Sequence, residues 1–182
     1  EKVGKVDLPA PDIFFGNDKM EVTDTDIYKS DQAFTQGQMI TVTGIDNLNE
    51  WWIDPDFFEK QSDGALKFLP INGDYRVTAN AVLKYFSVMA LKDGKPAKLQ
   101  DDGTGAIWAI GKGIGKPSVA SSEVGWEPGK ALCLAQVAPK KYQLTLKAGE
   151  TLKTSGDPEV ISFKFFHQND WGGEFGNYAN SI

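Results

Sequence analysis

The pattern of hydrophobic and polar positions predicts β-strands along most of the chain. Short apolar runs, rich in β-branched and aromatic residues, recur at intervals of about ten residues, with Gly, Pro, Asn and Asp between them, as is typical of β-sandwiches. Residues 142–146 alternate cleanly between polar and apolar, as a half-buried strand does. Eight strands are predicted, over residues 39–44, 65–69, 75–79, 85–91, 107–110, 131–136, 141–147 and 161–166.

No segment shows a sustained helical period, and only one short helical turn is predicted, near residues 55–60. Asp54 stands where a helix N-cap is expected and Pro55 occupies the first helical position. Asp54 and Asp56 also resemble a pair of catalytic carboxylates, although capping is a sufficient explanation for both. The glycine-rich segment 111–115 lacks a following helix and is interpreted as a mobile turn. The predicted fold class is therefore all-β, with tandem immunoglobulin-like β-sandwich modules.

Turn-rich segments divide the chain into parts. Residues 1–18 contain two prolines and little periodicity, and are predicted to be an N-terminal tether. A first β-sandwich-like module is expected over 19–92, a polar linker over 93–105, and a second β module over 106–182.

Composition excludes several classes of protein. With 41% hydrophobic residues, the 182-residue chain can form a substantial core. A net charge of −6 argues against nucleic acid as a partner, because phosphate binding needs clustered Lys and Arg. No apolar run approaches the ~20 residues of a membrane-spanning helix. The chain starts at Glu1 without Met, which is typical of a processed product. The single cysteine, Cys133, lies in an apolar run and is predicted to be buried and inert.

Catalytic and metal-binding patterns are weak. His167 is the only histidine, which excludes a metal site with several histidines. The acidic segments 24–26 and 101–105 do not have the spacing of a complete calcium loop and are interpreted as solvated turns. We therefore predict no catalytic residue, no metal and no cofactor, and expect that the protein is not an enzyme. A glycosidase fragment, with Glu174 and Asp170 as its carboxylates, is the remaining catalytic alternative.

The most informative segment is 161–175, where aromatic and ionic residues alternate up to Trp171, beside Gly172 and Gly173. An open indole with converging polar groups suits a sugar ring, because C–H faces stack on aromatics and hydroxyls form directed hydrogen bonds. Trp126 follows Gly125 in a loop of small and polar residues, so it is either a second ligand platform or a residue that closes one end of a sandwich.

The other three tryptophans are interpreted mainly as structural. Trp108 stands in mid-strand. Trp51 and Trp52 are adjacent, so their rings point to opposite faces of an extended segment. One of the two is expected in the core against Phe57 or Phe58, and the other at a surface or interface.

Several of these segments resemble a known family. The second module, with its segments 107–111, 125–126, 130–135, 142–146 and 163–175, is similar to the SusE/SusF-type outer-membrane proteins of Bacteroidetes. The first module, through segments 37–44, 51–58, 68–75 and 84–86, is similar to the leading domains of related surface glycan-binding proteins.

This resemblance implies non-catalytic binding of polysaccharide or oligosaccharide on the extracellular face of the outer membrane. It also implies an outer-membrane transporter complex as a partner in glycan uptake. A lipid anchor is implied as well, although no lipoprotein cysteine is present at the start. Family members continue through further strands, so a second module shortened at its C-terminus is expected. The alternative function is a structural or adhesive protein–protein interaction module that uses Trp51, Trp52 and an exposed sheet edge. The glycan-binding residues that the resemblance implies are Trp126 and Trp171, with Lys164, His167, Asn169, Asp170 and Glu174 as hydroxyl partners; Lys164 alternatively pairs with an acid on the solvent face.

Overall fold

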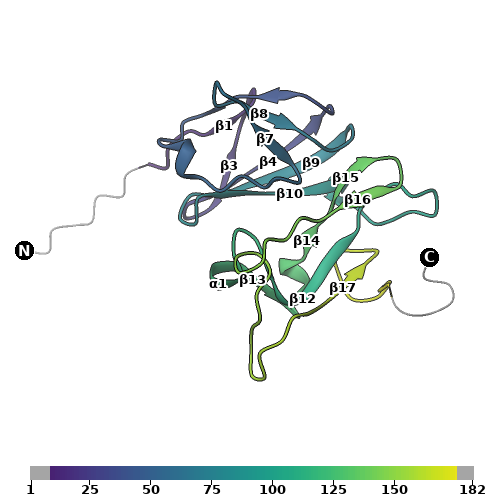
Figure 1. Cartoon of the computed structure of the whole chain (residues 1–182). Coiled ribbons are helices and arrows are strands. Elements are labelled where there is room, and N and C mark those ends of the chain that lie inside the picture. Colours follow the sequence, from purple (N-terminus) through teal and green to yellow (C-terminus); the bar gives the residue numbers. More distant parts are fainter. Residues whose placement is uncertain (1–8, 176–182) are drawn as a thin grey trace, which may run out of the picture.

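The computed structural model describes residues 9–175 and is built from antiparallel β-sheets (Figure 1), which confirms the all-β prediction. The helices are single turns: η1 (Leu48–Glu50), α1 (Val119–Ser122) and η2 (Pro128–Lys130). Within residues 9–175, no helix has the length and apolar character needed to cross a bilayer.

The first module packs a five-stranded sheet against two three-stranded sheets (Figure 1). The large sheet has the order β11-β10-β9-β4-β3, formed by β3 (Glu21–Asp24), β4 (Ile27–Phe34), β9 (Gly73–Asn80), β10 (Tyr85–Lys92) and β11 (Lys95–Pro96). The smaller sheets are β2-β1-β6, from β1 (Phe14–Phe15), β2 (Asp18–Lys19) and β6 (Val42–Thr43), and β5-β8-β7, from β5 (Met39–Ile40), β7 (Phe58–Lys60) and β8 (Leu66–Phe68).

Aromatic side chains fill the core between these sheets. Phe15 meets Phe34, Phe58 and Phe86 at centroid distances of 6.0, 5.7 and 5.2 Å, all edge to face. Because Ile13 and Phe15 are buried, and because β1 pairs with β2 and β6, this part of the expected tether belongs to the first module. The tether's residues 1–8 lie outside the described residues, as does the expected shortening of the second module at 176–182.

The second module is organised around the long strand β12 (Trp108–Gly115). Strand β17 (Ser162–Phe166) pairs with one side of it, and β13 (Glu123–Gly125) and β14 (Leu132–Cys133) pair with the other. A hairpin of β15 (Ala135–Ala138) and β16 (Lys141–Gln143) reaches the first module, where Ala135 is buried in the first core and the Ile71 amide donates to the Gln136 carbonyl at 2.8 Å.

The glycine-rich segment 111–115 is a buried strand, so its interpretation as a mobile turn is wrong. A Cβ built on Gly111 would lie 2.3 Å from the Cα of Phe163, and one on Gly115 would lie 2.5 Å from the Ser122 carbonyl oxygen. The glycines are therefore needed because neighbouring backbone passes where side chains would otherwise stand.

The predicted helical turn near 55–60 is only partly formed. The amides of Phe57 and Phe58 donate to the Asp54 carbonyl at 3.2 and 2.9 Å, which closes one turn. The chain then enters β7 at Phe58, since pairing with β8 satisfies its backbone and places Phe58 in the core.

Candidate functional site

Trp126 and Trp171, which we call the aromatic pair, form one exposed aromatic surface. Trp126 follows β13 and Trp171 follows β17, yet their rings stack at a centroid distance of 6.4 Å with an interplanar angle of 27°. Trp126 is 38% exposed and Trp171 is 49% exposed. The edge-to-face contact between Trp171 and the buried Phe166, at 5.9 Å, attaches the pair to the sheet.

The loop that carries Trp171 is held by hydrogen bonds at both ends. The His167 amide donates to the Gly173 carbonyl at 2.7 Å, and the Phe175 amide donates to the Phe165 carbonyl at 2.8 Å. Gly172 and Gly173 have φ angles of 90° and 64°, a left-handed conformation that favours glycine. The carboxylate of Asp170 accepts a hydrogen bond from the Trp171 amide at 2.7 Å, so the indole projects from a fixed turn.

An ion pair lies on the same face of β17 as Phe166, the residue that contacts Trp171. Lys164 Nζ lies 2.9 Å from Glu174 Oε2, and both side chains are exposed. Glu174 bridges to Phe166 across the hairpin, and Lys164 is two positions from Phe166, so strand alternation places all three side chains on one face. The ammonium and carboxylate groups retain free hydrogen-bonding positions for a ligand.

The remaining candidate residues differ in what their side chains contact. His167 directly follows Phe166, so its side chain points to the opposite face of the sheet. Its ring packs on Phe175 at a centroid distance of 4.3 Å. The Asn169 side-chain oxygen is buried and finds no hydrogen-bond donor within residues 9–175. Asp170 is engaged by the Trp171 amide. Of the seven candidates, the structure therefore pairs Trp126 with Trp171, and Lys164 with Glu174.

The other tryptophans have structural positions. Trp108 is fully buried and its Nε1 donates to the Ala97 carbonyl at 3.0 Å, which confirms the structural interpretation. Trp51 is the core member of the adjacent pair, as expected, but its ring partner is Phe86 at 4.7 Å instead of Phe57 or Phe58. Trp52 is half-buried.

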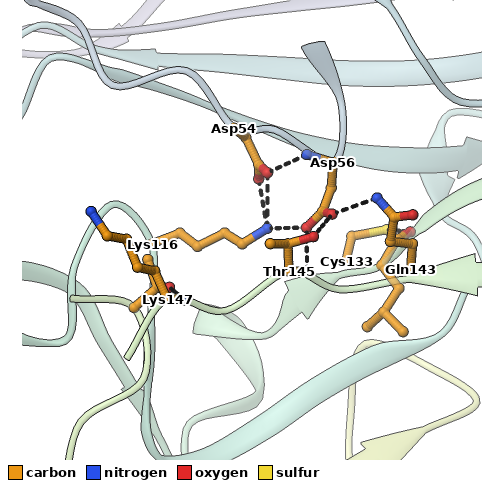
Figure 2. Close-up of polar contacts among 9 residues, drawn as sticks. Asp54, Asp56, Lys116, Cys133, Gln143, Thr145 and Lys147 are labelled. Carbon is orange, nitrogen blue, oxygen red and sulfur yellow. Dashed lines mark hydrogen bonds and ion pairs between the residues drawn. The ribbon is translucent and has the colours of Figure 1, made fainter. Parts of the chain in front are cut away.

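Asp54, Asp56 and Lys116 form a buried intermodule charge cluster (Figure 2). Lys116 Nζ, from the second module, lies 2.8 Å from Asp54 Oδ2 and 2.8 Å from Asp56 Oδ2, both in the first. Asp56 also accepts hydrogen bonds from Gln143 Nε2 at 2.9 Å, the Thr145 amide at 2.7 Å and Thr145 Oγ1 at 2.6 Å. The cluster, together with its partners Gln143 and Thr145, therefore links the modules through polar atoms that satisfy one another.

The two carboxylates differ in their protonation behaviour. Burial raises the pKa of Asp54, and the charge and hydrogen bonds of Lys116 offset only part of this effect. Burial also opposes ionisation of Asp56, but Lys116 and the hydrogen bonds from Thr145 outweigh it and hold the pKa of Asp56 below its ordinary value. Asp56 is thus the firmly charged partner of Lys116, and Asp54 accepts a proton first.

Asp54 and Asp56 were predicted to cap a helix, and no link between them and Lys116 was predicted. Capping does occur locally, because Asp54 Oδ1 accepts from the Asp56 amide at 3.0 Å. The missed signal was the apolar flank of the two acids, Trp51 to Ile53 before them and Phe57 and Phe58 after them. When the apolar residues on both sides of these acids are buried, the acids are buried too. A buried carboxylate needs a counterion.

No group of three or more His, Cys, Asp and Glu side chains suited to a metal ion occurs among residues 9–175. Cys133 is buried, as predicted, and burial raises the pKa of its thiol to about 12.

Comparison with known proteins gives two family matches. A family described as a domain of unknown function, DUF5125, matches residues 7–99, and a second, DUF5121, matches residues 102–181. The boundary between them falls inside the segment 93–105, which was predicted to be a linker. Searches among curated proteins and among solved structures found no match. Because the first match spans just over half of the 182 residues, the chain belongs to the DUF5125 family, and its C-terminal part carries a DUF5121 domain.

Proposed function

We propose that the protein binds polysaccharide or oligosaccharide without catalysis, through the aromatic pair. The observation that carries this proposal is the exposed stack of Trp126 and Trp171, which two separate loops build on one face of the second module. Exposed indole faces are rare on the surface of a soluble domain and favour ligands with C–H faces, such as pyranose rings.

The polar surroundings of the pair support the same ligand class. Lys164 and Glu174 neutralise each other at 2.9 Å, yet both keep exposed atoms that donate to or accept from sugar hydroxyls. Glu127 and Lys130, just after Trp126, repeat this arrangement at 3.4 Å. Paired charges beside an aromatic surface offer directed hydrogen bonds with little net charge.

The wider biological role is inferred from sequence resemblance. Similarity to SusE/SusF-type proteins supports a lipid-anchored protein on the extracellular face of the outer membrane, which passes glycan to a transporter complex. A single aromatic platform binds weakly, and many copies on one surface compensate through avidity.

Isothermal titration calorimetry against a panel of soluble polysaccharides tests the proposal. Replacing Trp126 or Trp171 by Ala removes about 1 kcal/mol of stacking, which weakens binding roughly fivefold. Phe14→Ala is the matched control, because Phe14 is an aromatic residue of similar exposure, 37%, in the first module. Unchanged affinity in both tryptophan variants, or no binding of any polysaccharide by the wild-type protein, contradicts the proposal.

A second candidate function, protein–protein interaction, is favoured by a separate observation. Ile161, Phe163 and Phe165 alternate along and beside β17 on the face opposite Phe166, and Ile161 and Phe165 are 44% and 37% exposed. Trp51 does not contribute to such a surface because it is buried. Analytical ultracentrifugation of the wild type and of a double variant, Ile161→Lys with Phe165→Lys, tests this second function. Self-association that the variant loses favours an interaction module. A monomeric wild type argues against self-association through this face.

A further inference from the structure

A groove with a volume of about 730 Å³ lies between the two modules, within the size range of small-molecule and cofactor sites. Strand β10 of the first module forms one wall. The opposite wall comes from α1, β13 and the segment that leads through η2 into β14, all in the second module. In Figure 1 these elements lie just below β10, which separates them from the first core.

The wall formed by β10 presents a side-chain row that the first core does not use. Phe86 and Val88 point into the first core, so alternation turns Tyr85, Ser87 and Met89 outward, and these three line the groove. A phenol ring, a hydroxyl and a flexible thioether therefore stand in line along one strand.

The opposite wall offers hydroxyl and charged groups. Ser121 and Ser122 have their hydroxyl oxygens 3.1 Å apart, and Lys130 and Glu127 form an exposed ion pair at 3.4 Å. Hydroxyls both donate and accept, as sugar hydroxyls do, so the two sets of groups are chemically matched. Apolar surface between them, from Leu132 for example, suits the C–H faces of a sugar chain.

The groove borders the loop that carries Trp126, although neither ring of the aromatic pair is part of its lining. Gly125 and Glu127 both line it, and Trp126 stands between them in the chain. We propose that one glycan chain occupies both places, with one sugar ring stacked on the aromatic pair and the following rings in the groove between the modules. This inference rests on the proposed glycan-binding function and extends it from a single platform to an oligosaccharide site that both modules build.

The inner end of the groove is pre-organised for such a ligand. Asp54 and Lys116 line it and are fixed by the intermodule charge cluster, so the spacing of the walls is set before a ligand arrives. A rigid groove adds contacts for each further sugar ring without a cost for ordering the protein. Affinity should therefore rise with chain length until the groove is full.

The experiment is calorimetric titration of the full chain with malto-, cello-, xylo-, manno- and laminari-oligosaccharides, from disaccharide to octasaccharide. Ser87→Trp fills the groove from an exposed position on β10, and Ser121→Tyr fills it from the opposite wall. Thr23→Trp is the matched control, because Thr23 is an exposed strand position outside the groove. Thermal melting of each variant confirms that it is folded.

We expect the wild type to bind the longest ligand about tenfold more tightly than the disaccharide of the same series. Each groove-filling variant should abolish this gain with length and change disaccharide affinity least, whereas Trp126→Ala should weaken binding at every length. If the wild type and both groove-filling variants bind long ligands with equal affinity, the groove is not part of the binding site. That result would not affect the proposal that the aromatic pair binds sugar. Failure of the wild type to bind any of these ligands or the polysaccharide panel overturns both proposals.

Discussion

Lys116 Nζ lies 2.8 Å from Asp56 Oδ2 although the two residues belong to different modules, and both side chains are buried. A buried ion pair gains little over an apolar contact of the same shape, because both charges give up their hydration. Removing one partner is costly, since the other charge then remains buried without a counterion. The relationship between these two residues therefore makes the interface between the modules sensitive to single substitutions.

Lys116→Met should lower the free energy of unfolding by about 3–5 kcal/mol, because it leaves two buried carboxylates without their cation. Urea denaturation monitored by circular dichroism measures this change. Lys147→Met is the matched control: Lys147 pairs with Glu150 at 2.6 Å on the exposed surface, where an ion pair contributes about 0–1 kcal/mol. Equal effects of the two substitutions would contradict a stabilising role for the buried cluster.

The stability contribution of Asp56 should depend on pH. The pKa of Asp56 is held below its ordinary value, so its ionised form favours the folded state above the ordinary aspartate range of about 4, and this contribution is lost as pH falls through the depressed pKa. The difference in unfolding free energy between wild type and Asp56→Asn should therefore narrow on acidification.

Asp54→Asn should behave differently from Asp56→Asn. The pKa of Asp54 is raised, so its ionisation disfavours the folded state and the penalty grows as pH rises above the ordinary aspartate value. At neutral pH Asp54→Asn should thus cost less stability than Asp56→Asn. Denaturation series across pH measure both variants, and the reverse order of stabilities would refute this assignment of charges.

Gly111→Ala should destabilise the second module by more than about 2 kcal/mol. The new Cβ would lie 2.3 Å from the Phe163 Cα and from the Ser162 carbonyl oxygen, so β17 would have to move away from β12. Gly129→Ala is the control, because a Cβ there has no neighbour within 4 Å and its effect should stay within about 0.5 kcal/mol. Thermal denaturation of the two variants compares them directly.

Trp126 and Trp171 should be energetically coupled. A double-mutant cycle with Trp126→Ala and Trp171→Ala, measured by urea denaturation, should give an interaction energy of about 0.5–1.5 kcal/mol, the range for contacting aromatic rings. The pair Trp126→Ala and Phe14→Ala should be additive, because Phe14 lies in the first module. Additivity in both cycles would mean that the indoles do not stack in solution.

Cys133 should resist alkylation in the folded protein. It lines the groove, is buried, and has its pKa raised by burial to about 12, so little thiolate forms near neutral pH. Iodoacetamide labelling followed by mass spectrometry should be slow in the wild type and faster in Lys116→Met, where the modules are held less firmly. A rate in the folded wild type equal to that of the urea-unfolded protein would contradict burial.

Ten of the seventeen strands among residues 9–175 overlap a predicted strand, and two of the differences have clear physical reasons. Strand β4 was missed because its inward positions include Ser30 and Gln32, which interrupt the apolar alternation. The Gln32 side chain donates to the Phe15 carbonyl and to Ser30 Oγ, both at 2.8 Å, so these polar groups are satisfied where an apolar residue would otherwise stand. The second half of β12 was missed because its glycines resemble a turn. In the structure these glycines leave space for the backbone of neighbouring segments.

The candidate site was predictable in part. The composition of segment 161–175 was enough to nominate Trp171, and Gly125 drew attention to Trp126. Strand alternation alone could have predicted that His167 and Lys164 point to opposite faces of the sheet, because they are three positions apart along the strand. The link between Asp56 and Lys116 could not be predicted locally, since sixty residues separate them and only the packing of the modules brings them together.

The β15–β16 hairpin has a consequence for how this polypeptide unfolds. Ala135 completes the first hydrophobic core and Gln136 accepts a hydrogen bond from Ile71, although both hairpin residues belong to the DUF5121 match. Severing the chain between the two matched regions would therefore uncover apolar surface in the N-terminal half. The boundary between the two family matches therefore does not separate two independently folding units. Both halves should unfold together in a single cooperative transition.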